Sequence, residues 1–110
     1  MVYLIIIKNN ITMKLKKLIF EAIGTFLLTF AVGMSIHMIQ FDNVKDLSNM
    51  KGLSFFMVYM FLFPVGRTIS GCHLNPIISF AMFFIKKIDI VEMVSYMIAQ
   101  ILAAVASSLF

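Results

Sequence analysis

The chain has 110 residues, of which 62% are hydrophobic and 13% charged, and its formal net charge is +4. A soluble domain has about 45–50% apolar and about 25% charged residues, so this composition indicates a membrane protein. The nine Lys and Arg residues are scattered between apolar runs, which argues against a nucleic-acid-binding groove. The single cysteine, Cys72, allows no internal disulfide.

Three apolar stretches have the length of membrane spans. The first covers residues 18–41, and a helix of that length measures about 36 Å, enough to cross a bilayer with some tilt. The second covers residues 50–66 and the third residues 90–110. Asp89 is a predicted N-cap of the third span, and with Glu92 at the third helical position the pattern is close to a capping box. We therefore predict an all-α membrane protein with three transmembrane helices.

The sequence SGCHLNPIIS, residues 70–79, interrupts the apolar pattern between the second and third spans. Asn75 is a favourable N-cap, and Pro76 suits the first helical position because its missing N–H would have no partner there. A helix over residues 76–85 would measure about 15 Å, half of the bilayer core. Non-helical backbone at that depth is tolerated only where it is buried in protein or lines a water-filled cavity. The pattern therefore predicts a re-entrant loop and half-helix at a pore or central site.

The positions of the basic residues predict the orientation in the membrane. Lys and Arg gather before the first span and around the half-helix, at Lys8, Lys14, Lys16, Lys17, Arg67, Lys86 and Lys87. The segment 42–51, between the first two spans, carries no net charge. The positive-inside rule therefore places residues 1–17 and 67–89 in the cytoplasm. We predict a multi-pass integral membrane protein, surrounded by lipid, with a cytoplasmic N-terminus.

Three motifs resemble the aquaporin family, also called the major intrinsic proteins, which are water and glycerol channels. They are EAIGTFLLTF at 21–30, SGCHLNPI at 70–77 and AQILAA at 99–104, in the family's order. The resemblance covers residues 18–110 and concerns the N-terminal half of the family only. It implies the first repeat of the aquaporin fold and passive passage of water or a small neutral solute such as glycerol. It implies no cofactor, no metal and no nucleic-acid partner.

The resemblance also implies roles for residues of the loop. Asn75 would donate its side-chain amide to passing water at the positive end of the half-helix dipole, which disfavours cations and protons. Pro76 and Ile77 would complete the family's NPA motif, with the larger Ile in place of Ala crowding the pore centre. The carbonyl groups of Gly71, Cys72 and His73 would form part of a ladder of acceptors for water. In a complete pore the thiol of Cys72 would face the same path; the alternative is that Cys72 is only a small residue in a small space.

Two residues on the spans are implied as well. Phe55 falls at the family's constriction position on the second helix, and a Phe there resembles the narrow, water-preferring members. Glu21 resembles the glutamate that braces the loop through the backbone N–H groups of residues 71–75. A carboxylate inside a span is expensive and usually has a partner, although Glu21 alone could also mark the membrane–water boundary. His73 without the motif would more often be a structural histidine.

The resemblance includes no second half, and the family pore lies between two inverted repeats. We therefore expect a half-length channel protein that needs a second aquaporin-like half or a full-length relative; family members are homotetramers. A second possibility is a non-conducting fragment or a subunit that docks on a full-length channel. A third possibility is an unrelated membrane protein. An enzyme is not expected, because no nucleophile–base set, metal-ligand cluster or phosphate loop stands in the sequence.

Overall fold

The computed structural model describes residues 1–41 and 50–109, and in these ranges the chain forms four helices and no strand. They are α1 (Val2–Phe41), α2 (Met50–Ile69), α3 (Pro76–Phe84) and α4 (Ile90–Ser108). Every helix except α3 is long and apolar enough to cross a membrane. The nine residues of α3 extend only about 14 Å, which is less than half of a bilayer core. The predicted fold class, all-α with three spans and one half-helix, is confirmed.

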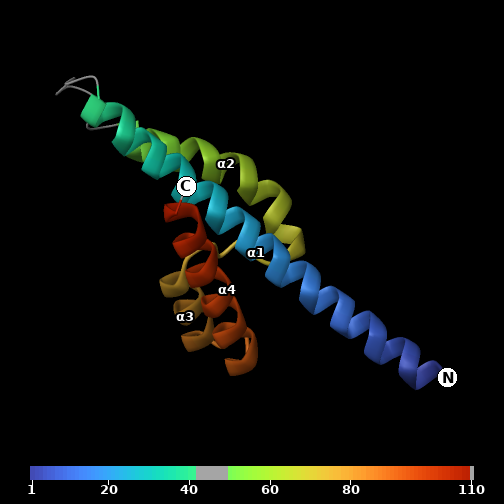
Figure 1. Cartoon of the computed structure of the whole chain (residues 1–110). Helices are drawn as coiled ribbons and strands as arrows, with labels where there is room; N and C mark the ends of the chain where they lie inside the picture. Colours follow the sequence, from blue (N-terminus) through green and yellow to red (C-terminus); the bar gives the residue numbers. More distant parts are fainter. Residues whose placement is uncertain (42–49, 110) are drawn as a thin grey trace.

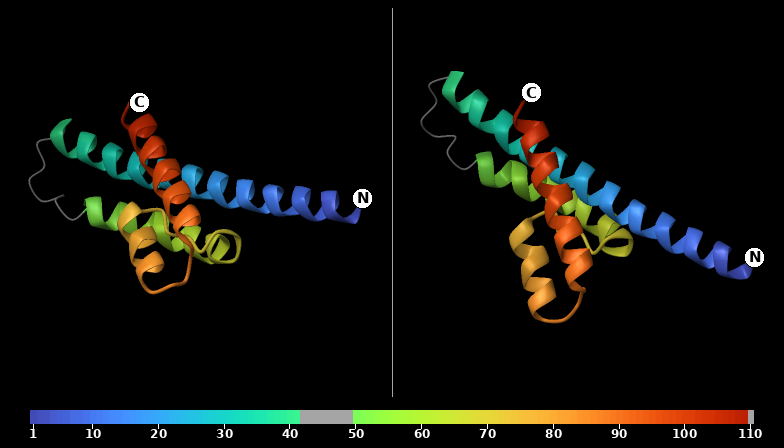
Figure 2. Two further views of the ribbon diagram at one scale, coloured as in Figure 1. Left: turned by 90° about the horizontal axis from the view of Figure 1, so that it is seen from below. Right: turned by 60° about the horizontal axis from the view of Figure 1, so that its bottom comes forward.

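The helix α1 is the axis on which the other elements are placed (Figure 1). Both α2 and α4 pack against α1, and α3 packs against α4. Figure 2 shows α3 and α4 as a hairpin that hangs from α1, with the loop before α3 returning from the end of α2. Residues 70–75, which form this loop, therefore lie where all the longer helices meet.

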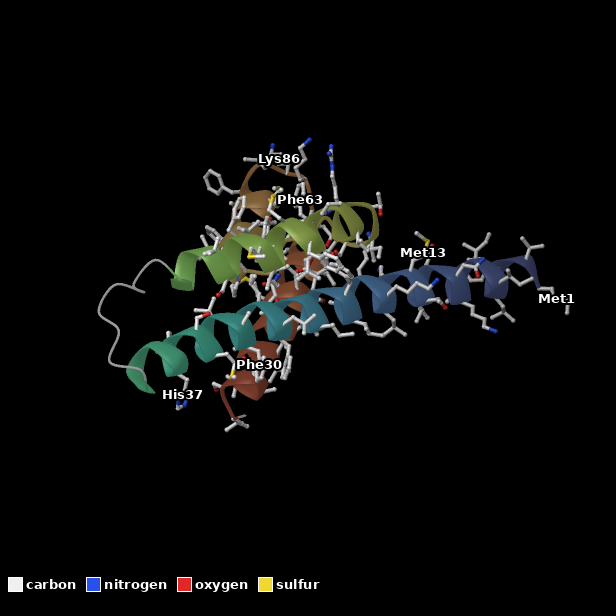
Figure 3. All side chains as sticks on the ribbon, turned by 90° about the horizontal axis from the view of Figure 1, so that it is seen from above. Met1, Met13, Phe30, His37, Phe63 and Lys86 are labelled. Carbon is white, nitrogen blue, oxygen red and sulfur yellow. The ribbon has the colours of Figure 1, made fainter. Side chains whose placement is uncertain are left out.

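The helix bounds differ from the predicted ones at several ends. The first helix was expected over 18–41 but begins at Val2, because residues 2–17 contain no Pro or Gly that would end a helix. Met1 and Met13 mark this N-terminal part of α1, whose residues are exposed as far as Lys16 (Figure 3). The second helix continues past 66 to Ile69, whereas the third span ends at Ser108. Most of the segment 42–51 used in the orientation argument lies outside the described residues.

Both predicted N-caps are confirmed. The side-chain oxygen of Asn75 accepts a hydrogen bond from the N–H of Ile77 at 2.9 Å, and Pro76 is the first helical residue. The Oδ1 atom of Asp89 accepts from the N–H of Glu92 at 2.7 Å. These caps fix where α3 and α4 begin, and so they fix the lengths of the loops around the half-helix.

The apolar core is small and includes the loop itself. Leu28 of α1 is buried together with Cys72 and Leu74 of the loop. Partly buried side chains of α1 and α2 pack against these three, namely Phe20, Val58, Tyr59 and Leu62. The core therefore holds the loop between α1 and α2.

Candidate functional site

The loop before α3 has an unusual backbone. The φ angles of Gly71, Cys72 and Leu74 are 89°, 54° and 55°. For a residue with a Cβ atom this left-handed region costs roughly 1–2 kcal/mol. Such a conformation persists only where surrounding contacts hold it in place. The side chains that hold the loop therefore determine where Asn75 and the start of α3 lie.

The carboxylate of Glu21 is the centre of those contacts. It is completely buried, and four donors converge on its two oxygens. The Ser70 hydroxyl at 2.7 Å and the His73 N–H at 2.9 Å donate to Oε1. The Leu74 N–H at 2.7 Å and the Gln100 side-chain amide at 2.9 Å donate to Oε2. Two backbone groups of the loop are therefore fixed by one side chain of α1.

The same network continues into α3 and α4. The amide of Gln100 also donates to the hydroxyl of Ser79 at 3.0 Å, and both side chains are fully buried. Nδ1 of His73 lies 3.0 Å from the same hydroxyl. The Tyr96 hydroxyl donates to the carbonyl of Ser70 at 2.8 Å. Buried polar groups that are fully paired rigidify a structure, so this network ties the loop to three helices.

Asn75 lies at the end of the loop, and only the oxygen of its side-chain amide has a hydrogen-bond partner among the residues that the structure describes. Its Oδ1 atom accepts from the N–H of Ile77, so the NH₂ group is the part of the side chain that can donate to a ligand. The side chain of Asn75 is partly exposed, and that of Ile77 is 76% exposed. The positive end of the α3 dipole lies at the same point.

The other predicted residues lie around the loop in different environments. Phe55 is 44% exposed and stacks on Tyr59, with ring centroids 5.9 Å apart. The Tyr59 hydroxyl donates to the carbonyl of Cys72 at 3.3 Å, so this carbonyl already has one partner. Gly71 is exposed, whereas His73 is buried.

The thiol of Cys72 is only 1% exposed, and it packs in the apolar core. This position fits the interpretation of Cys72 as a small residue in a small space rather than the placement of its thiol along a water path. The positive φ of Cys72 turns its side chain into the core, which sequence spacing alone does not reveal. A role of its carbonyl group stays a prediction.

Several members of the network were not predicted from the sequence. They are Ser70, Ser79, Tyr59, Tyr96 and Gln100. Gln100 carried a usable signal, because a polar amide inside an apolar span is expensive and needs a partner. In the part of the chain that the structure describes, no group of three or more His, Cys, Asp or Glu residues could hold a metal ion.

Comparison with known proteins identifies relatives of the chain. Residues 8–110 match the family described as Major intrinsic protein, a match that begins before the residue 18 expected from the motifs. Aquaporin Z of Rhodopseudomonas palustris is 35% identical over 101 residues, covering 87% of this chain and 40% of that protein. Glycerol uptake facilitator protein-like 6 of Lactiplantibacillus plantarum is 32% identical over 94 residues, covering 86% and 41%.

Nodulin-26 of Glycine max is 28% identical over 97 residues, covering 86% of the chain and 35% of the relative. The chain thus spans between 35% and 41% of the length of these curated relatives. No solved structure matches it.

Proposed function

Because the chain belongs to the major intrinsic protein family, we propose that it supplies the N-terminal repeat of an aquaporin-type channel for water or small neutral solutes such as glycerol. The observation that supports this most directly is the hydrogen bonding of Glu21 to the N–H groups of His73 and Leu74. These bonds hold a strained loop that ends on Asn75 and the half-helix. A site of this kind needs a fixed donor at the membrane centre, and the brace provides it. No catalytic step is part of the proposal.

In this proposal Asn75 donates its NH₂ group to a water molecule or a hydroxyl group of the solute. The start of α3 adds its positive dipole end, which disfavours cations and protons at the same point. The carbonyl groups of Gly71, Cys72 and His73 accept hydrogen bonds from the water or solute molecules that pass in single file. Phe55 and Ile77 narrow the path.

A second aquaporin-like half completes the channel in this proposal. Side chains of α3 are apolar and widely exposed at Ile77, Phe80 and Phe84, with exposed fractions of 76%, 51% and 78%. A second half-helix inserted from the opposite side would cover the first of these and enclose the path. The N-terminus lies in the cytoplasm, and assembled channels associate as homotetramers.

Swelling of vesicles, followed by light scattering, tests the proposal. One set contains this chain alone, a second contains the C-terminal half of a full-length relative, and a third contains both. We expect water permeability above background only in the third set, since one repeat cannot enclose a pore. Fast swelling with this chain alone would overturn the half-channel proposal.

Asn75→Asp is the matched variant for the third set. Asp retains an oxygen that can cap α3, so the half-helix should still begin at Pro76. The variant replaces the donor NH₂ group by an acceptor, and we expect swelling to fall to background while the helical content is unchanged. Unchanged swelling would show that Asn75 is not the donor.

The exposed Ile77 favours a second candidate, a non-conducting subunit that docks on a full-length channel. Ile at this position is larger than the Ala of the family motif and would crowd the pore centre. If the two halves copurify and remain impermeable, the Ile77→Ala variant separates the two candidates. If only the Ile77→Ala variant is permeable to water, the side chain of Ile77 blocks the pore of the parent protein. If the variant also remains impermeable, the docking subunit is favoured.

A further inference from the structure

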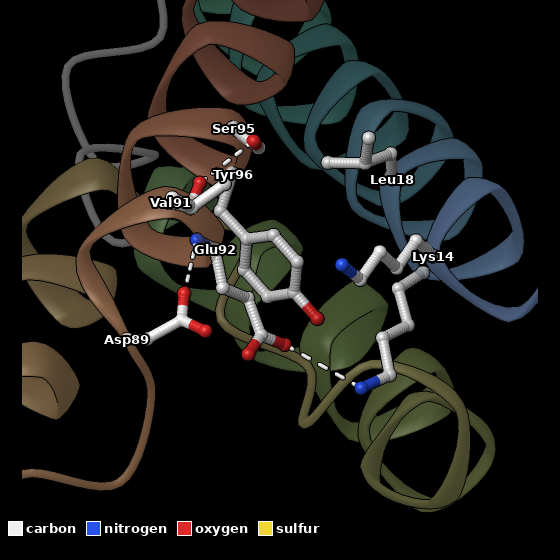
Figure 4. A pocket seen from close by; sticks show the side chains of 8 residues that line it. Lys14, Leu18, Asp89, Val91, Glu92, Ser95 and Tyr96 are labelled. Atoms are coloured by element: carbon white, nitrogen blue, oxygen red, sulfur yellow. Dashed lines mark hydrogen bonds and ion pairs between the residues drawn. The ribbon is translucent and has the colours of Figure 1, made fainter. Parts of the chain in front are cut away.

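A cavity with charged and apolar lining residues lies between α1 and the first turns of α4. It has a volume of about 120 Å³. Its lining consists of Lys14, Lys17, Leu18, Asp89, Val91, Glu92, Ser95 and Tyr96. One water molecule needs only about 10–15 Å³ of such space, so the cavity has room for a larger polar group. Figure 4 shows Lys14 and Glu92 extending into this space from opposite helices.

The charges of the lining are divided between the two helices. Lys14 and Lys17 come from α1, three residues apart and therefore on one face of the helix. Asp89 and Glu92 come from the beginning of α4. The cavity thus has a cationic wall and an anionic wall and is neutral as a whole. A ligand with both a positive and a negative group complements it better than a simple anion or cation does.

The residues that line the cavity still have charged groups and hydrogen-bond acceptors that such a ligand could use. Lys17 and Glu92 are paired at 3.5 Å with side chains 36% and 29% exposed, and a pair of this kind contributes little to stability. The pair can therefore open for a ligand at low cost. The hydroxyl of Ser95 donates to the carbonyl of Val91 at 2.7 Å, so its oxygen lone pairs remain to accept from an ammonium group.

The place of the cavity in the membrane selects the ligand class. Lys14 and Lys17 directly precede the apolar stretch 18–41 that the sequence predicts to span the membrane, and Val91, 67% exposed, gives the rim an apolar side. The cavity is therefore at the level of lipid headgroups, with apolar surface next to it for the beginning of an acyl chain. We propose that it binds the headgroup of a phospholipid that carries a primary ammonium group, the phosphate against the lysines and the ammonium against Glu92, Asp89 and Ser95. The proposal is independent of any channel activity.

Lipid retention by the intact chain tests the proposal. The chain is purified in detergent and offered phosphatidylethanolamine, phosphatidylglycerol or phosphatidylcholine with identical acyl chains, and bound lipid is counted by native mass spectrometry. We expect preferential retention of phosphatidylethanolamine, because phosphatidylglycerol lacks the ammonium and phosphatidylcholine cannot donate hydrogen bonds from its methylated nitrogen. Equal retention of all three lipids would overturn the proposal.

Two variants and a control assign the contact. Lys14→Gln should weaken retention of phosphatidylethanolamine about fivefold, the loss expected for one exposed charge contact. Lys16→Gln makes the same charge change at an exposed residue outside the cavity lining and should have no effect. Glu92→Gln should weaken retention of phosphatidylethanolamine but not of phosphatidylglycerol. If Lys16→Gln and Lys14→Gln act alike, surface charge alone attracts the lipid and the cavity is not the site.

A soluble competitor separates a lipid site from a site for a free phosphate ester. Phosphoethanolamine has the same charged groups but no acyl chain. It should displace the bound lipid only at a concentration far above that of the lipid. Displacement at equal concentration would show that the cavity recognises a soluble ester and would contradict the lipid assignment.

Discussion

The substitution Glu21→Gln tests whether one carboxylate holds the loop in place. The side chain keeps its shape but has one acceptor oxygen instead of two. If the new NH₂ group takes the place of Oε1, it faces the donors of Ser70 and His73; in the place of Oε2 it faces those of Leu74 and Gln100. Either orientation leaves one backbone N–H of the loop against another donor.

The magnitude follows from the two lost hydrogen bonds. Hydrogen bonds to a charged group contribute roughly 1.5–3 kcal/mol each, so the loop should lose about 3–6 kcal/mol of local stability. The lower figure corresponds to about a 100-fold loss of protection against opening. We expect this loss to be confined to residues 70–75 at first, because the long helices retain their own backbone hydrogen bonds.

Hydrogen exchange followed by mass spectrometry, on a peptide that contains residues 70–75, measures this change in the detergent-solubilised chain. Glu92→Gln is the control, because it makes the same chemical change at a partly exposed side chain whose ion pair with Lys17 is 3.5 Å long. The control should exchange like the parent chain in the loop. If Glu21→Gln also exchanges like the parent, the loop is held by its apolar contacts and the argument for a carboxylate brace is wrong.

Three further predictions concern the packing and the orientation of the chain. Gly66→Ala should destabilise the fold by roughly 1–3 kcal/mol, because an added Cβ would overlap the Phe20 ring and lie 2.9 Å from the Cβ of Cys72; Gly33→Ala meets nothing within 4 Å and should be neutral or stabilising in thermal unfolding. The thiol of Cys72 should react with a maleimide only after denaturation, and fast labelling of the folded chain would contradict its burial. In sealed right-side-out vesicles, Lys86→Cys should react with a membrane-permeant maleimide only, and labelling by an impermeant one would refute the cytoplasmic placement.

The caps and the helix class were predictable from the sequence because they depend on local chemistry. Asn75 precedes Pro76, which suits the first helical position, and Asp89 precedes an apolar run; each side chain accepts from a backbone N–H two or three residues further along. The apolar runs likewise fix the number of spans. The start of α1 was not predictable in this way, because residues 2–17 are permitted in a helix without being required there.

The network around the loop depends on long-range contacts that no local pattern encodes. Gln100 reaches Glu21 across 79 positions of the chain, and it meets Ser79 only because α3 folds back on α4. The thiol of Cys72 could not be placed either, because its direction depends on a positive φ that an L-residue rarely adopts. In contrast, the need of Glu21 for a partner was predictable, because an unpaired carboxylate in an apolar span is energetically costly. The loop was the polar segment available to pair with it.

The proposed half-channel depends on two features, the braced loop 70–75 and the exposed start of α3. Around the loop, the buried groups of Glu21, Ser79 and Gln100 are paired with one another or with the loop, so the position of Asn75 is fixed before any partner arrives. At the start of α3, Ile77 remains 76% exposed. A binding surface that is already ordered loses little conformational entropy when it associates, so a second half would meet a preorganised face. Loosening the brace should therefore weaken assembly with that half even though Glu21, being fully buried, contributes nothing to the exposed surface.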